Sequence, residues 1–254
     1  MVTMNRLHFV RPWRLLRDVV DLCYPPTCAA CQAFCGEAGE LCGGCSAQLQ
    51  TLESTPACDL CGRSLAYPDA PCPHCLGLGI SHYDRVVRLA SFDPPLRLLV
   101  HRFKYHGHWP VGEMLADRLL GSERAKGLLS EADCLLPVPL HRLRQFVRGY
   151  NQAHVVAQRL GRRCNLPLAD AVARHRYTQT QTHLHSRRQR MRNLKDAFVL
   201  KDPDQIRRRH IVVIDDVMTT GATLQILARA LRPARPASLS AIVVAVADPK
   251  KMGT

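Results

Sequence analysis

Short apolar runs of strand length alternate with longer segments of helical periodicity over the last two thirds of the chain. The clearest run is Ile211–Ile214, four β-branched residues in succession, which is typical of a strand buried on both faces of a parallel sheet. The ranges that we expect to be strands are Tyr83–Phe92, Cys134–Leu136, Ile211–Ile214 and Leu239–Ala245, and the expected helices are Leu96–Phe103, Val111–Leu120, Gln152–Arg163 and Ala222–Leu231. This alternation predicts an α/β fold with a parallel sheet.

The first 80 residues lack this alternation and are marked by cysteine instead. Ten of the twelve cysteines precede residue 76, and eight of them form C-x2-C pairs that recur thirty positions apart. The eight are Cys28, Cys31, Cys42 and Cys45, followed by Cys58, Cys61, Cys72 and Cys75. A duplication this regular indicates a structural repeat. We therefore expect a cysteine-rich module in residues 1–80 and an α/β domain in residues 81–254.

The spacing of these cysteines is that of zinc ligands. Two cysteines separated by two residues can direct both sulfurs at one ion, and two such pairs complete the tetrahedral shell that Zn²⁺ prefers. Since no export signal is recognised, zinc is favoured over disulfides or an iron–sulfur cluster. We expect two structural zinc ions held by consecutive pairs, although the spacing also allows an interleaved pairing. A shell of four thiolates leaves no open position for a substrate, so neither ion is expected to be catalytic.

The composition predicts a cytoplasmic protein with no membrane span. Hydrophobic residues make up 46% of the chain and charged residues 22%, and no apolar run approaches the roughly 18 residues that a span requires. The N-terminal stretch is interrupted by four arginines and Asp18, so it lacks the continuous apolar segment of a signal peptide. We expect a short amphipathic helix there, packed against its own chain.

The net charge of +14 is concentrated in one block of the chain. Residues 137–209 carry seventeen Lys and Arg against four Asp and Glu, a net charge of +13, whereas residues 1–80 have a net charge of −2. Such a block suits a polyanion, either a nucleic acid or a phosphorylated small molecule. A solvated arginine-rich surface is the simpler alternative.

The strand run Ile211–Ile214 leads into Asp215 and Asp216 and then into a turn of small residues that opens the expected helix. Ligands of open α/β sheets bind beyond the carboxyl ends of the strands, and the exposed N–H groups at a helix N-terminus form an anion site. The aspartates can accept hydrogen bonds from sugar hydroxyls or approach Mg²⁺. Sugar hydroxyls beside a phosphate describe a ribose 5-phosphate.

The stretch IVVIDDVMTTGATL, from Ile211 to Leu224, resembles the 5-phosphoribosyl-1-pyrophosphate (PRPP) loop of type I phosphoribosyltransferases. The resemblance implies a phosphoribosyltransferase-like parallel sheet with helices on both faces, and PRPP bound together with Mg²⁺. It implies that Asp215 and Asp216 hold the ribose hydroxyls. The implied contacts to the 5-phosphate are Thr219, Thr220, Gly221, Ala222 and Thr223.

The remainder of the chain is similar to the ComF/GntX family. The double zinc ribbon is followed by FKYHGH, PVPLHRLRQFVRGYNQ and QTHLHSRRQRMRNLKDAF, and the family is associated with DNA uptake in natural transformation and with recombination of the imported strand. The resemblance implies that Lys104 and Arg148 act on the phosphates as catalytic residues together with the two aspartates. It also makes His141, Arg142 and Arg190 candidate PRPP contacts. Simpler alternatives are solvation of Lys104 and Arg142.

Three functions are compatible with these features. The first is a phosphoribosyltransferase, and the second is a single-stranded DNA module with Tyr105, Trp109, Phe146 or Tyr150 stacking on bases. The third is a non-catalytic, PRPP-sensing adaptor or regulator that binds a partner through its zinc ribbons. We expect the first two jointly: a PRPP-binding protein of phosphoribosyltransferase type that acts on imported single-stranded DNA beside the uptake or recombination machinery. No motif identifies the acceptor base.

Overall fold

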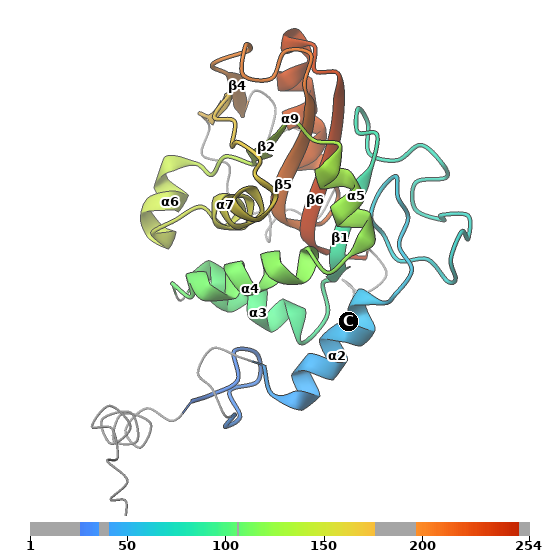
Figure 1. Ribbon diagram of the computed structural model, residues 1–254, viewed down its shortest axis with the longest axis vertical. Helices are drawn as coiled ribbons and strands as arrows, with labels where there is room; N and C mark the ends of the chain where they lie inside the picture. The colour runs from blue at the N-terminus through green and yellow to red at the C-terminus, as the bar shows by residue number, and fades with distance from the viewer. Residues whose placement is uncertain (1–25, 36–40, 106, 176–196, 249–254) are drawn as a thin grey trace, which may run out of the picture.

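The computed structural model describes residues 26–35, 41–105, 107–175 and 197–248. Its centre is a four-stranded sheet in the order β1-β6-β5-β2, with every neighbouring pair parallel (Figure 1). The strands are β1 (Val86–Ser91), β2 (Cys134–Pro137), β5 (His210–Met218) and β6 (Ser238–Val246). The α/β prediction with a parallel sheet is therefore confirmed.

Helices cover both faces of this sheet. On β5, Ile211 and Val213 belong to the buried cluster that contains α9 (Ala222–Leu231), whereas Val212 and Ile214 belong to the cluster on the opposite face. The four side chains are at most 2% exposed. Burial on both faces explains why the strand reads as an unbroken apolar run.

The layer opposite α9 includes the helices α3 (Leu96–Tyr105), α4 (Trp109–Leu119), α5 (Glu123–Ser130) and α7 (Gln152–Cys164). The packing of α3 on α4 is close, since a Cβ atom at Gly112 would lie 2.4 Å from the ring of Phe103. Arg159 of α7 binds Asp117 of α4 at 2.7 Å. This layer fixes the C-terminal end of α3, which carries Lys104. None of the helices in the described part of the chain is long and apolar enough to cross a bilayer.

In the described part of the α/β domain, two α-helices and two strands were not expected from the sequence. A short helix, α6 (Arg142–Arg148), replaces the loop predicted between β2 and α7. His141 caps it by accepting a hydrogen bond from Leu143 N, and Gly149 ends it with a φ of 79°, so local capping makes a helix of this segment. The others are α5 and the antiparallel pair β3 (Val172–Arg174) and β4 (Phe198–Leu200).

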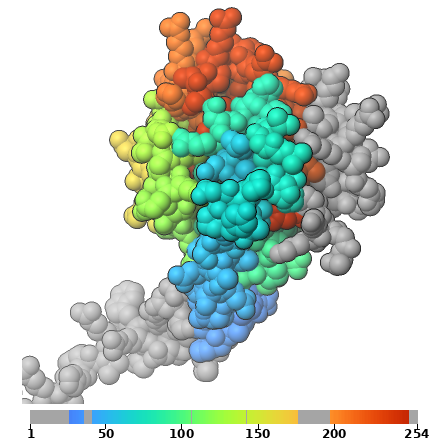
Figure 2. All heavy atoms as spheres, turned by 90° about the vertical axis from the view of Figure 1, so that its right-hand side faces the viewer, coloured from blue at the N-terminus to red at the C-terminus, as the bar shows by residue number. Residues whose placement is uncertain are grey.

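The cysteine repeat is visible in the backbone. Isolated antiparallel bridges join Thr27 to Phe34 and Ala57 to Ser64, thirty residues apart, and the helix α2 (Gly43–Glu53) lies between them. The first ribbon contacts α3, because Arg102 Nη1 donates to the carbonyl of Cys28 at 3.4 Å. The second ribbon lies on the face of the domain that is turned to the viewer in Figure 2, next to the C-terminal elements in red.

Candidate functional site

The eight repeated cysteines form two groups, Cys28, Cys31, Cys42 and Cys45, and Cys58, Cys61, Cys72 and Cys75. Within each group the sulfur atoms lie within 4.8 Å of one another, with 3.7 Å between those of Cys31 and Cys42 and 3.6 Å between those of Cys61 and Cys72. Four thiolates around one zinc ion at about 2.3 Å produce separations of this size. Both groups therefore fit a structural zinc ion, and the pairing is consecutive rather than interleaved.

The two aspartates lie within β5, where Asp215 pairs with Val243 of β6. Asp216 Oδ2 forms an ion pair with Lys104 Nζ at 3.0 Å. The side chain of Asp216 is 14% exposed and that of Lys104 is 19% exposed. Burial, reinforced by the neighbouring charge of Asp216, raises the pKa of Asp215 to about 7, although Lys104 and Arg174 act in the opposite direction. The carboxyl group of Asp215 is therefore partly protonated near pH 7.

The turn after β5 is shaped as an anion site. Gly221 has a φ of 77° and precedes the first residue of α9, so no side chain caps the helix at that position. The first N–H groups of a helix have no intrahelical partner, and here the contact from Ala222 N to Thr220 Oγ1 is long, at 3.4 Å. A small depression is lined by residues 217–224 together with Asp215. The dipole of α9 favours an anion in it.

A cavity of about 430 Å³ joins this turn to α3 and to the segment between β2 and α7. It brings together six of the residues predicted for the site: Lys104, Arg148, Asp215, Asp216, Thr219 and Thr223. Arg148 donates to Gln152 Oε1 at 3.2 Å, and its guanidinium carbon lies 5.3 Å from the centre of the Tyr105 ring. The cavity therefore places two carboxylates, two cations and an anion-binding turn around one space.

Two family models match separate parts of the chain: a double zinc ribbon domain over residues 19–76 and a phosphoribosyl transferase domain over residues 147–253. Competence protein F of Haemophilus influenzae is 37% identical over 199 residues, which are 76% of this chain and 84% of that protein. The chain belongs to the ComF/GntX family. DNA utilization protein YhgH of Escherichia coli K12 is 35% identical over 75% of this chain and 83% of that protein. Competence protein ComFC of Bacillus subtilis is 25% identical over 76% of this chain and 78% of that protein.

Three other predicted residues of this ComF chain, His141, Arg142 and Arg190, are not among the described residues that line the cavity. His141 is outside the cavity lining and accepts the hydrogen bond that caps α6, from Leu143 N at 3.2 Å. Arg142 is the first residue of α6, and its side chain lies outside the described part of the structure. Arg190 lies outside the described residues. Asn151, by contrast, lines the cavity and also caps α7 by accepting from Ala153 N at 3.1 Å.

Four basic residues of the cavity lining were missed in the sequence: Arg97, His101, Arg144 and Arg174. Arg97, His101 and Lys104 are spaced i, i+4 and i+7 on α3, so the helical period could have grouped the first two with the lysine. Arg174, at the end of β3, stacks on the ring of Phe198 at 5.4 Å. Burial and the charge of Arg144 lower the pKa of Arg174 to about 10, against the opposing effect of Asp215.

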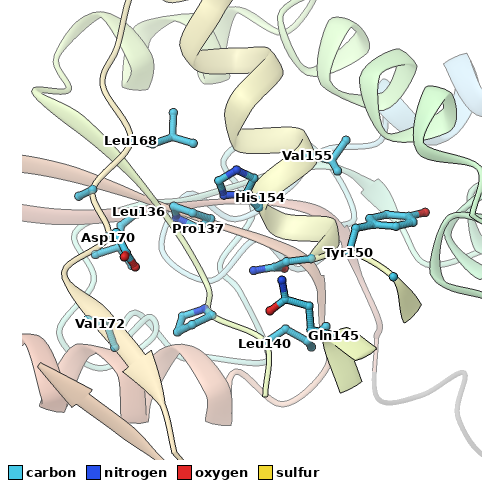
Figure 3. A pocket seen from close by; sticks show the side chains of 14 residues that line it. Leu136, Pro137, Leu140, Gln145, Tyr150, His154, Val155, Leu168, Asp170 and Val172 are labelled. Atoms are coloured by element: carbon cyan, nitrogen blue, oxygen red, sulfur yellow. The ribbon is translucent and has the colours of Figure 1, made fainter. Parts of the chain in front are cut away.

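A second hollow, of about 520 Å³, lies beside the edge strand β2 (Figure 3). Leu136, Leu168 and Val172 give it apolar walls, with His154 and Asp170 at its sides. Among the described residues, its lining contains no lysine or arginine, so it lacks a permanently cationic side chain to neutralise a phosphate. The cavity beside β5 is therefore the candidate site of this ComF chain.

Proposed function

We propose that this chain binds PRPP with Mg²⁺ in the cavity beside β5 and acts as a phosphoribosyltransferase-type protein of DNA uptake in the cytoplasm. The observation that supports the proposal most strongly is the placement of Asp215 and Asp216 beside the uncapped turn of α9. Carboxylates suit ribose hydroxyls and Mg²⁺, and the turn suits the 5-phosphate. The names of the relatives, competence protein F and DNA utilization protein YhgH, support the process.

In the proposed complex, Asp215 and Asp216 accept hydrogen bonds from the ribose hydroxyls and offer oxygen ligands to Mg²⁺. The backbone N–H groups of residues 219–223 and the hydroxyl groups of the threonines hold the 5-phosphate. Lys104, which pairs with Asp216 at 3.0 Å, exchanges this partner for the pyrophosphate. Arg148 is the second cation on that side of the cavity.

The reaction class is substitution at C1 of the ribose. The bond from C1 to the pyrophosphate oxygen breaks, and the bond from C1 to a nitrogen of the acceptor forms. Pyrophosphate leaves with the electron pair and takes up the proton that the acceptor nitrogen loses. Bound Mg²⁺ supplies charge neutralisation to the pyrophosphate. Lys104 and Arg148 stabilise the same developing charge, and stabilisation of this kind by fixed, preorganised groups usually lowers the barrier of such a step more than any other effect.

The direct test is calorimetric titration of the zinc-loaded protein with PRPP in the presence of Mg²⁺. We expect saturable binding at one site per chain, and an absence of binding would refute the proposal. Release of pyrophosphate is then measured with purine bases, pyrimidine bases and orotate in turn. Binding with no release for any acceptor would instead favour the non-catalytic, PRPP-sensing adaptor.

The affinity for PRPP is expected to rise with pH. The pKa of Asp215 is raised to about 7, so below that pH the carboxyl group carries a proton that binding must remove. The affinity should fall by about tenfold for each pH unit below the pKa. Titrations in two buffers of different ionisation enthalpy will count the released proton. The Asp215→Asn variant separates this effect from the titration of PRPP itself, and an equal pH dependence in both proteins would contradict the assignment.

A surface beside the cavity supports single-stranded DNA as a second ligand. On α6, Phe146 and Val147 are 89% and 81% exposed, although apolar side chains of this size are commonly buried. Arg144 and Arg148 of the same helix line the cavity, and Tyr105 at the end of α3 is 53% exposed. Exposed aromatic rings among arginines are the usual means of holding bases and backbone without sequence preference.

We expect oligonucleotide affinity to fall steeply with salt, since phosphates are neutralised by the basic block. Phe146→Ala should weaken binding about tenfold by removing one stacking ring. PRPP affinity should stay unchanged, because Phe146 is not part of the cavity lining. Leu78→Ala is the matched control, since Leu78 is 86% exposed on the second ribbon. A flat salt response, or equal losses in both variants, would count against this surface.

A further inference from the structure

Arg63 belongs to the second zinc ribbon, but its side chain ends behind the phosphate-binding turn. Its Nη2 donates to the carbonyl of Thr219 at 2.8 Å and its Nη1 donates to the carbonyl of Ala247 at 3.2 Å. The residue is only 9% exposed. Ala247 N in turn donates to Met218 O at 2.9 Å, so a single guanidinium bridges the ends of β5 and β6.

The zinc-binding loop itself fixes Arg63. Its carbonyl accepts a hydrogen bond from Cys58 N at 2.9 Å, and Gly62 N donates to Cys58 O at 2.7 Å. The next residue, Ser64, donates to Asp248 Oδ2 at 2.8 Å and accepts from Arg88 Nη2 at 2.9 Å. The loop that presents two cysteines to the metal therefore also sets the position from which Arg63 reaches the turn.

A second contact from the same ribbon lies against the back of the turn. A Cβ atom at Gly221 would lie 2.8 Å from Ile80 Cδ1, so the Ile80 side chain occupies the space beside that glycine. Ile80 N donates to Leu60 O at 3.1 Å. Ile80 shares one buried cluster with Cys58 and Cys61 of the ribbon and with Met218 and Ala222 beside the turn.

We propose that Arg63 is a positioning residue for the phosphate, so that the second ribbon forms the rear of the binding site; the inference rests on the proposed function. A trans peptide unit directs its N–H and its C=O in opposite directions. By holding the carbonyl of Thr219 on the rear side, Arg63 directs the N–H of Thr220 toward the front, where the anion binds. Without Arg63 this peptide can turn, and a carbonyl oxygen in the depression would repel a phosphate.

The test compares Arg63→Gln and Arg63→Lys with Arg124→Gln. Arg124 is the matched control, because it also ties the domain to the second ribbon, donating to Ala57 O at 2.7 Å and pairing with Asp59 at 3.2 Å. Affinities are measured calorimetrically, with Mg²⁺ present, for ribose 5-phosphate and separately for pyrophosphate. Zinc content and melting temperature are recorded for every variant.

We expect Arg63→Gln to bind ribose 5-phosphate about tenfold more weakly or worse, with two zinc ions retained and pyrophosphate affinity unchanged. Arg63→Lys should show an intermediate loss, since an ammonium lacks the planar fork that serves two carbonyls. Arg124→Gln should bind as the wild type does. This selective loss would support the positioning role.

Wild-type affinity for ribose 5-phosphate in both Arg63 variants would overturn the inference and leave the proposed function standing. Equal losses for the two ligands, or loss of zinc from Arg63→Lys as well as from Arg63→Gln, would also overturn it, because the residue would then act only through stability. If the wild-type protein binds neither ribose 5-phosphate nor PRPP, the proposed function fails and the inference fails with it.

Discussion

Replacement of Asp215 and Asp216 by asparagine is expected to weaken PRPP binding by at least about a hundredfold, since each substitution removes a charge-assisted hydrogen bond. The thermal stability of the protein, in contrast, should not fall when Asp215 is replaced. The raised pKa of Asp215 shows that its charge is disfavoured in the folded protein. The charged carboxylate therefore lowers the free energy of unfolding, and this destabilisation is largest above a pH of about 7. At pH 8 we therefore expect an Asp215→Asn substitution to leave the melting temperature unchanged or higher.

The measurement pairs calorimetry with thermal unfolding of the same samples. Asp170→Asn is the control, because that carboxylate is exposed and its side chain pairs with Lys201 at 2.7 Å outside the candidate cavity. Undiminished PRPP affinity in the double variant would contradict the role of the two aspartates. A large loss of stability would show instead that they support the fold.

Loss of the second zinc site is expected to be far more damaging than loss of the first. Cys61 is 1% exposed and belongs to the buried cluster that also contains Val86 of β1 and Val246 of β6. Cys31 is exposed. Structural zinc contributes about 10 kcal/mol or more to folding of its module. Both modules pack against the sheet, but the described contacts to the turn, from Arg63 and Ile80, come from the second one. Cys61→Ala should therefore lower the melting temperature by at least about 10 °C and abolish PRPP binding.

Cys31→Ala should leave PRPP binding within about twofold of the wild type, because no described residue of the first ribbon lines the cavity. Zinc content by mass spectrometry should fall from two ions to one in each variant. Val87→Ala, a buried change on β1 outside both ribbons, calibrates the effect of lost packing alone. Similar melting temperatures for Cys31→Ala and Cys61→Ala would contradict the unequal roles of the two sites.

The features that the sequence predicted well depend on residues close together along the chain. Strand β5 was recognisable because burial on both faces requires an unbroken apolar run, and the turn follows it directly. The zinc groups were predictable because each closes within eighteen residues, from Cys28 to Cys45 and from Cys58 to Cys75. Their consecutive pairing became certain only with the sulfur positions, since spacing alone allowed both arrangements.

The features that the sequence did not predict depend on distant contacts. Arg63 and Thr219 are 156 positions apart, and no local pattern marks an arginine that will reach a particular carbonyl. Arg174 joins the cavity through the pairing of β3 with β4. Helix α6 was expected as a loop. Its apolar residues Leu143, Phe146 and Val147 have helical spacing but face solvent, so the segment has no buried face that would produce a clear amphipathic pattern.

The contacts of the second ribbon determine how this chain can be dissected. A fragment that begins at residue 81 would lose Arg63, Ser64 and Ile80, and with them the hydrogen bonds to Thr219, Ala247 and Asp248. It would also expose Val86 and Val246, which lie 3.3 Å from a Cβ atom built at Gly62. A truncation at the expected boundary between residues 80 and 81 should therefore destabilise the domain. We expect the smallest fragment that folds by itself to begin before Cys58.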